Sequence, residues 1–176
     1  MIQRNKLRIM NIFFEEPARN FYLREVSRIT KIAVMTTRKY LMELEKEGLI
    51  LKDKSTLYPS YKANDTSRLF RAYKQQAMIL LICSSGLIDY LEKAMLPRCI
   101  VLFGSIRKGE YTKNSDIDLF IQAQKKELEF GKFEKMLKHK ISPLFEPNLA
   151  ELSEELLNNI INGIVLYGSL KIRGQK

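Results

Sequence analysis

The chain of 176 residues is long enough for one ordinary domain or two small ones. Hydrophobic residues make up 45% of it and charged residues 28%, a composition that supports packed cores and argues against a disordered chain. The net charge of +10 is uneven, because residues 1–75 hold 16 Lys and Arg against 8 Asp and Glu. A polyanionic partner for this part and a merely solvated basic surface are both consistent with that excess.

Neither a signal peptide nor a membrane span is expected. Residues 1–20 mix charged and apolar positions, and the longest apolar run, Met78–Cys83, is far too short to cross a bilayer. We therefore expect a soluble, cytoplasmic protein. Cys83 and Cys99 lie among apolar residues and are expected to be buried free thiols, whereas His139, in a Lys-rich stretch, is expected at the surface.

The N-terminal part has a helical pattern followed by an extended one. The spacing of the apolar residues predicts three helices. The first ends near Pro17, the second covers residues 23–29, and the third covers residues 33–47 and ends at Gly48. Two short extended runs, residues 49–52 and 57–63, flank a polar turn and predict a hairpin.

Three helices and a hairpin are the layout of a winged helix, and residues 26–32 and 36–50 resemble that family closely. The resemblance implies a winged helix-turn-helix domain over residues 1–65. Its third helix would enter the major groove of double-stranded DNA and its hairpin would meet phosphates. The expected DNA-binding residues are Thr36, Arg38, Lys39, Lys52 and Lys54. The alternative is a winged helix used for dimerisation or domain packing.

Residues 66–96 form a predicted helical linker, broken near Ser84–Gly86 and closed by Pro97. Its apolar stripe is wider than an exposed spacer needs. Such a stripe either packs on both domains or makes a homodimer contact.

A compact motif follows the linker. The buried strand predicted over residues 99–103 runs directly into Gly104–Ser105, and after ten residues a second strand begins at Asp116-Ile117-Asp118. Glycine lets a triphosphate approach the backbone, and the hydroxyl and free N–H groups of a helix start bind phosphate oxygens. Two carboxylates two apart on a strand point to one face, where they can share magnesium ions.

This G-S-x10-D-x-D pattern resembles the minimal nucleotidyltransferases of the DNA polymerase beta superfamily. The resemblance implies an α+β protein with a small mixed-sheet α/β nucleotidyltransferase domain over residues 97–176. It also implies Mg²⁺, in one or two sites, and a nucleoside triphosphate, with ATP favoured, whose nucleoside monophosphate is transferred to a hydroxyl. Catalytic and metal roles fall to Asp116 and Asp118. The expected nucleotide-binding residues are Gly104, Ser105, Arg107, Lys108 and Lys113.

The resemblance implies a third carboxylate on a later strand of catalytic members, although some members of the group work with the two-Asp set, so its lack leaves transfer open. After a helix predicted over residues 127–140, that position is occupied by Ser142, and no Asp follows Asp118. Glu146 is either the substitute or an ordinary loop residue. We lean towards a transferase, with a protein side chain as preferred acceptor because toxin–antitoxin modules use similar small transferases on a partner. The alternative is a DNA-binding regulator whose C-terminal domain only senses nucleotide or is vestigial.

Overall fold

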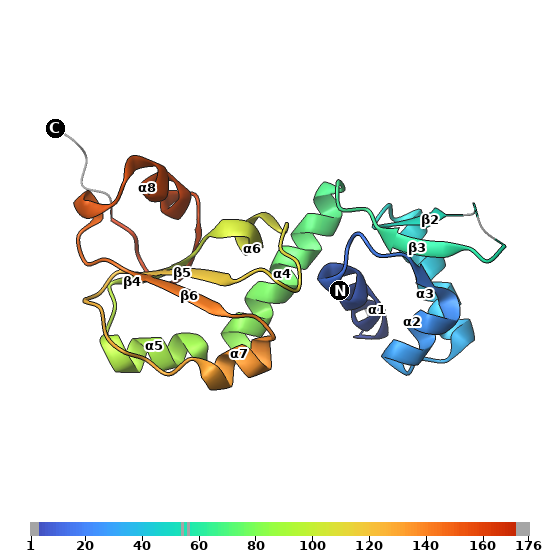
Figure 1. Ribbon diagram of the computed structural model, residues 1–176, viewed down its shortest axis with the longest axis horizontal. Coiled ribbons are helices and arrows are strands. Elements are labelled where there is room, and N and C mark those ends of the chain that lie inside the picture. The colour runs from blue at the N-terminus through green and yellow to red at the C-terminus, as the bar shows by residue number, and fades with distance from the viewer. Residues whose placement is uncertain (1–3, 54, 56, 172–176) are drawn as a thin grey trace. The chain divides into compact units, whose positions relative to one another are not determined.

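A computed structural model describes residues 4–53, 55 and 57–171 of the chain, and Figure 1 shows its elements. The chain divides into two compact units, Met1–Lys74 and Gln75–Lys176. Both mix helices and strands, so the expected α+β class is confirmed. Among the residues described, no helix is both long enough and apolar enough to cross a membrane.

The N-terminal unit contains three helices and a small antiparallel sheet. Its elements are α1 (Arg4–Glu15), β1 (Phe21–Tyr22), α2 (Leu23–Thr30), α3 (Val34–Lys46), β2 (Ile50–Asp53) and β3 (Ser60–Ala63). The sheet has the order β1-β3-β2, with both pairings antiparallel. The three predicted helices and the hairpin are therefore present near their expected limits. The two-residue strand β1 was not predicted, because it is too short to show a period of two.

Aromatic side chains hold this unit together. Phe13 and Phe14 on α1 are buried, as the helical spacing of its apolar residues requires. The Phe13 ring lies 5.4 Å from that of Phe21 on β1, and the Phe14 ring lies 5.2 Å from that of Phe70, both edge-to-face. Because Phe70 belongs to α4 (Arg68–Ser84), the first turns of that helix pack into the N-terminal unit.

The predicted linker is two helices, α4 and α5 (Leu87–Met95). They are separated at Gly86, whose φ of +77° is a left-handed conformation that glycine adopts without strain, so the expected break is confirmed. Cys83 near the end of α4 is exposed, which makes the expectation of a buried thiol wrong there, whereas Cys99 is buried as expected. Both thiols are free.

The C-terminal unit is built on a four-stranded mixed sheet of order β6-β5-β4-β7. Its strands are β4 (Cys99–Leu102), β5 (Ile117–Ile121), β6 (Ile141–Phe145) and β7 (Ile164–Gly168). The central strand β4 runs antiparallel to β5 and β7, and β5 runs parallel to β6. The strands expected near residues 99–103, 116–121 and 141–146 are therefore present.

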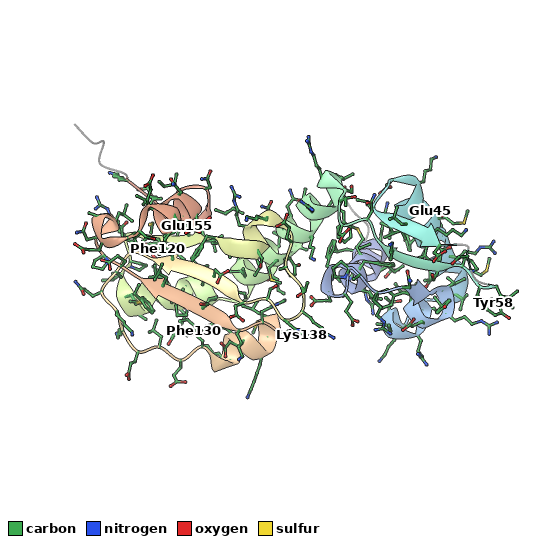
Figure 2. The ribbon with its side chains drawn as sticks, turned by 45° about the horizontal axis from the view of Figure 1, so that its top comes forward. Glu45, Tyr58, Phe120, Phe130, Lys138 and Glu155 are labelled. Atoms are coloured by element: carbon green, nitrogen blue, oxygen red, sulfur yellow. The ribbon has the colours of Figure 1, made fainter. Side chains whose placement is uncertain are left out.

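Helices cover both faces of this sheet, as Figure 1 shows. Residues of α5, of α7 (Gly131–Leu137) and of the last turns of α4 share a core with Ile100, Leu119 and Ile141. The opposite face carries a smaller core of Val101, Phe120 and Ile160, the last from α8 (Glu154–Ile161). Figure 2 labels Phe120 on the sheet and Glu155 on α8. Asp118 stands two residues before Phe120 on β5, so the two side chains point to the same face of the sheet.

Two helices of this unit depart from the expectation. The helix predicted over residues 127–140 is shorter, with Phe130 and Lys138, labelled in Figure 2, as its caps. Lys138 has a φ of +58°, a left-handed conformation that ends the helix before the strand. Helix α8 was not predicted, although Ser153 caps it by accepting a hydrogen bond from the Leu156 N–H at 3.3 Å.

Candidate functional site

The junction between β4 and the short helix α6 (Gly104–Lys108) forms the centre of the site. The Phe103 N–H donates a 3.1 Å hydrogen bond to the Asp118 carbonyl, which extends the pairing of β4 with β5 by one residue. The chain then turns sharply at Gly104, where φ is +71°. The helix ends at Gly109, which has a φ of +68°. Both turns require conformations that favour glycine.

Gly104 lies directly against the side chain of Asp118. A Cβ at Gly104 would stand 2.9 Å from Asp118 Cγ and closer still to Oδ2. The missing side chain at position 104 therefore makes room for the Asp118 carboxylate. This packing is a second reason for glycine at position 104, independent of the approach of a triphosphate to the backbone.

Asp116 and Asp118 form an electrostatically coupled pair. Asp118 lies on β5 and is half-buried, whereas Asp116 is exposed immediately before that strand. Burial, and then the charge of Asp116, raise the pKa of Asp118 above its usual 3.8. Among the described residues, no basic side chain forms an ion pair with either carboxylate. A bound cation would relieve this repulsion, so the pair fits a divalent metal.

The register of β5 and β6 places Ser142 beside Asp118. The two residues are paired across the parallel strands, so their side chains share one face of the sheet, and Ser142 is exposed. Glu146 lies four residues further along, beyond the end of β6, or about 13 Å at 3.3 Å per residue. Glu146 therefore does not stand beside Asp118. Within the described ranges, no group of three or more His, Cys, Asp or Glu is placed to hold a metal.

The other residues expected to contact nucleotide lie on α6 and the loop after it. Ser105 and Arg107 are half-buried, and Lys108 and Lys113 are exposed. Helix α6 is held from behind, because Gln75 Nε2 donates a hydrogen bond to the Arg107 carbonyl. None of the three basic side chains is ion-paired with a carboxylate of the described residues. Their charges therefore remain available to phosphate oxygens.

Sequence reasoning missed one residue beside the site. His139, expected at the surface, is 3% exposed. Its Nδ1 lies 2.7 Å from the Ser115 carbonyl, next to Asp116 in the chain. The Lys-rich neighbourhood was misleading because those lysines point outward while the imidazole turns into the core. Only the pairing of β6 with β5 brings residues 139 and 115 together, so no local signal identified the contact.

A cleft lies beyond the C-terminal end of β5, away from Asp116 and Asp118 at its start. It is lined by Leu96, Arg98, Gln122, Lys125 and Pro147, among others. None of the residues expected to bind nucleotide or metal lines it. The geometry at Asp118, rather than the size of this cleft, therefore identifies the candidate site.

In the N-terminal unit, the candidate DNA contacts are placed on α3 and the hairpin. Thr36, Arg38 and Lys39 lie in the first turns of α3, with Thr36 half-buried and the two basic residues exposed. Lys52 on β2 is half-buried, with its Nζ 5.8 Å from the centre of the Tyr61 ring. Lys54 lies outside the described residues. A shallow groove on α3 is lined by Met35, Arg38, Lys39, Met42, Glu43 and Lys46.

Comparison with known families gave one match, which lies in the C-terminal part of the chain. The family model described as "Polymerase beta, Nucleotidyltransferase" matches residues 86–171, just under half of the chain. No significant match was found among curated proteins or solved structures. The matched range begins at the break between α4 and α5 and includes the whole sheet with Gly104, Asp116 and Asp118. The match therefore supports a nucleotidyltransferase domain in the C-terminal unit.

Proposed function

We propose that the C-terminal unit binds a nucleoside triphosphate with Mg²⁺, ATP being favoured, and transfers its nucleoside monophosphate to a hydroxyl. The observation that carries the proposal is the Asp118 carboxylate packed against Gly104, with Asp116 close enough to raise the pKa of Asp118, within the matched domain. We propose a protein side chain as the acceptor and a cytoplasmic setting of the toxin–antitoxin kind. The proposed modules are a winged helix over residues 1–65, a linker over 66–96 and a transferase domain over 97–176.

In this proposal each part of the site has one task. Asp116 and Asp118 hold the divalent cation, which when bound polarises the phosphates and neutralises developing charge. Gly104 and Ser105 leave N–H groups and a hydroxyl for the phosphate oxygens, and Arg107, Lys108 and Lys113 add positive charge. The acceptor hydroxyl gives up its proton to solvent as its oxygen forms a bond to the α-phosphorus, and the bond from that phosphorus to the leaving pyrophosphate breaks.

A labelling experiment tests transfer. The wild-type chain and an Asp116→Ala/Asp118→Ala variant are each incubated with α-labelled ATP, Mg²⁺ and a cell extract. We expect label to move to a macromolecule only with the wild type. Absence of transfer from both proteins contradicts the transferase proposal, and calorimetric titration of Mg²⁺–ATP then decides whether binding alone is retained.

Ser142 favours a second candidate function. Because a hydroxyl rather than a carboxylate stands beside Asp118, the site has fewer anionic groups to accept a proton from the acceptor hydroxyl. The alternative is a regulator that binds DNA and uses the C-terminal unit to sense nucleotide. A protein that binds Mg²⁺–ATP tightly yet transfers no label would support this alternative.

We also propose that the N-terminal unit binds double-stranded DNA through α3 and the hairpin. The supporting observations are the exposed Arg38 and Lys39 at the start of α3 and the basic excess of this part of the chain. The test is duplex affinity against salt concentration. Arg38→Ala/Lys39→Ala should lower the slope of log K against log salt by about 2 if both residues contact phosphates. A wild-type affinity that does not change with salt would overturn the proposal.

We also propose that α4 makes a homodimer contact. Leu80 and Leu81 on α4 are exposed in the single chain, at 68% and 41%. A sedimentation experiment on the wild type and on Leu80→Glu tests it. A monomer in both cases would reject the dimer.

A further inference from the structure

We propose that His139 is a positioning residue that fixes the loop carrying Asp116, and so sets the geometry of the two-carboxylate site. The expected effect on metal–nucleotide binding rests on the proposed function, whereas the contact between His139 and the loop is independent of it. His139 is the single histidine of the chain, and it lies between α7 and β6, outside the sequence motif.

The hydrogen bond from His139 has a defined direction. Its Nδ1 lies 2.7 Å from the Ser115 carbonyl oxygen. A carbonyl oxygen only accepts, so Nδ1 carries the proton and donates. The imidazole is 3% exposed, and a hydrogen bond between buried groups is costly to lose. The bond therefore restrains the backbone one residue before Asp116.

The loop from Gly109 to Asp116 is restrained at other points, which isolates the task of His139. The Tyr111 ring is buried and lies 5.6 Å from the His139 ring, edge-to-face. A turn follows, in which the Ser115 N–H donates to the Thr112 carbonyl and the Thr112 N–H donates to Ser115 Oγ, both at 2.9 Å. This turn carries exposed Lys113 at its tip. Without His139, the turn would remain folded but could shift as one piece.

The other side of Asp116 is held by the sheet. The Ile117 N–H donates a hydrogen bond to the Lys140 carbonyl at 2.8 Å. Residues 139–140 and residues 115–117 are therefore joined by two hydrogen bonds, this one and the bond from His139 to Ser115. Asp116 itself is exposed and precedes β5, so no ladder hydrogen bond fixes it directly. The flanking contacts at Ser115 and Ile117 therefore determine where its carboxylate stands relative to Asp118.

Three variants separate the donor from the packing. His139→Leu keeps an apolar side chain of similar size and removes the donor. His139→Asn loses part of the ring packing on Tyr111 but places an amide N–H near the position of Nδ1. His139→Gln carries the same amide one carbon further out. If His139→Leu does not fold, the comparison of the Asn and Gln variants still isolates the position of the donor.

Two measurements on the full chain test the proposal. We expect His139→Leu and His139→Gln to weaken Mg²⁺–ATP binding about 5- to 10-fold by calorimetry, the loss of one hydrogen bond, and His139→Asn to restore most of it. Hydrogen exchange at the Ile117 amide, whose hydrogen bond to the Lys140 carbonyl is not part of the turn, should accelerate by a similar factor in the Leu and Gln variants only, when measured without ligand. Melting temperature serves as the control for packing, and it should fall in all three.

The outcomes distinguish two failures. If the wild type does not bind Mg²⁺–ATP, the proposed function fails. The hydrogen-exchange rates then still show whether His139 restrains the loop. If exchange in His139→Leu equals that of the wild type, or if the Asn and Gln variants behave alike in both measurements, His139 does not position the loop and the inference is overturned.

Discussion

The Asp118 carboxylate lies where the side chain of residue 104 would otherwise stand. A Cβ at Gly104 would be 2.9 Å from Asp118 Cγ, and the backbone there has a φ of +71°. Any other residue would meet both a strained backbone and a displaced carboxylate. The glycine of the motif and its second aspartate are therefore one structural unit, although thirteen residues lie between them in the chain.

Gly104→Ala is expected to destabilise the C-terminal unit by about 2–4 kcal/mol, from left-handed strain together with the clash. Mg²⁺ affinity should fall as well, because the Asp118 side chain must move. Urea unfolding and calorimetric titration of Mg²⁺ measure the two effects.

Gly131→Ala is the matched control for that substitution. Gly131 begins α7, does not have positive φ, and has open space around its Cβ position. Alanine there should leave stability within about 0.5 kcal/mol of the wild type or raise it slightly, since alanine favours helices. Equal effects of the two substitutions would contradict the proposed contact between Gly104 and Asp118.

Asp118→Asn should stabilise the metal-free protein at neutral pH while weakening Mg²⁺ binding at least about tenfold. Burial and Asp116 raise the pKa of Asp118 above 3.8, so the folded state releases this proton at higher pH than the unfolded chain does. The protonated Asp118 therefore contributes to the free energy of unfolding. This contribution is complete below pH 3.8 and is lost as the pH rises through the pKa of Asp118 in the folded state. Asparagine removes that loss.

Thermal unfolding across this pH range, with and without Mg²⁺, checks the effect of Asp118→Asn. Glu127→Gln, at an exposed acid between β5 and α7, is the control and should reproduce the wild-type curve. An Asp118→Asn protein that gains stability from Mg²⁺ as the wild type does would exclude Asp118 as a ligand.

The local part of the site could be predicted from sequence, whereas its support could not. Gly104, Asp116 and Asp118 lie within fifteen residues that alternate between apolar strand and polar turn, so their chemistry can be read from spacing. The His139–Ser115 contact spans 24 residues and depends on how β6 pairs with β5. Pairing register is a tertiary property and leaves no periodic trace in the sequence.

The fold, like the site, was predicted only where the signal lies within a short stretch of sequence. The helices of the N-terminal unit were predicted because each carries an apolar stripe and a recognisable end, such as the left-handed Gly48 after α3. Strand β1 escaped prediction because two residues cannot display alternation. Helix α7 is shorter than expected because Lys138 has a left-handed backbone conformation. A lysine in the sequence does not predict that conformation.

Lys74 predicts a pH dependence of the N-terminal unit. Burial lowers the pKa of this 2% exposed residue to about 8, with Glu15 and Asp65 opposing the shift. The unfolded chain keeps the proton up to its ordinary pKa of 10.5, so stability is lowest below about pH 8 and rises as pH increases from 8 to 10.5. The gain should approach roughly 3 kcal/mol.

Lys74→Met provides the comparison, because it keeps the length of the side chain and removes the titrating group. The difference in unfolding free energy between the two proteins should change over that pH interval and be constant above it. A difference that is independent of pH between 7 and 11 would show that Lys74 titrates normally.

Ser142→Asp should convert the site to three carboxylates. Because Ser142 is paired with Asp118 across β5 and β6 and is exposed, a carboxylate there would face the same ion. The metal-free protein should lose stability through added repulsion, and Mg²⁺ affinity should rise about tenfold. Transfer of labelled nucleotide should appear or increase, since the new group can accept the proton of the acceptor hydroxyl.

Ser142→Asn is the neutral counterpart of nearly the same shape. It should neither lower metal-free stability by repulsion nor raise Mg²⁺ affinity, so the difference between the two variants reports charge alone. If both variants bind Mg²⁺ equally, residue 142 does not face the ion. If only Ser142→Asp transfers nucleotide while the wild type binds it, the natural chain is a nucleotide sensor whose serine withholds the third carboxylate.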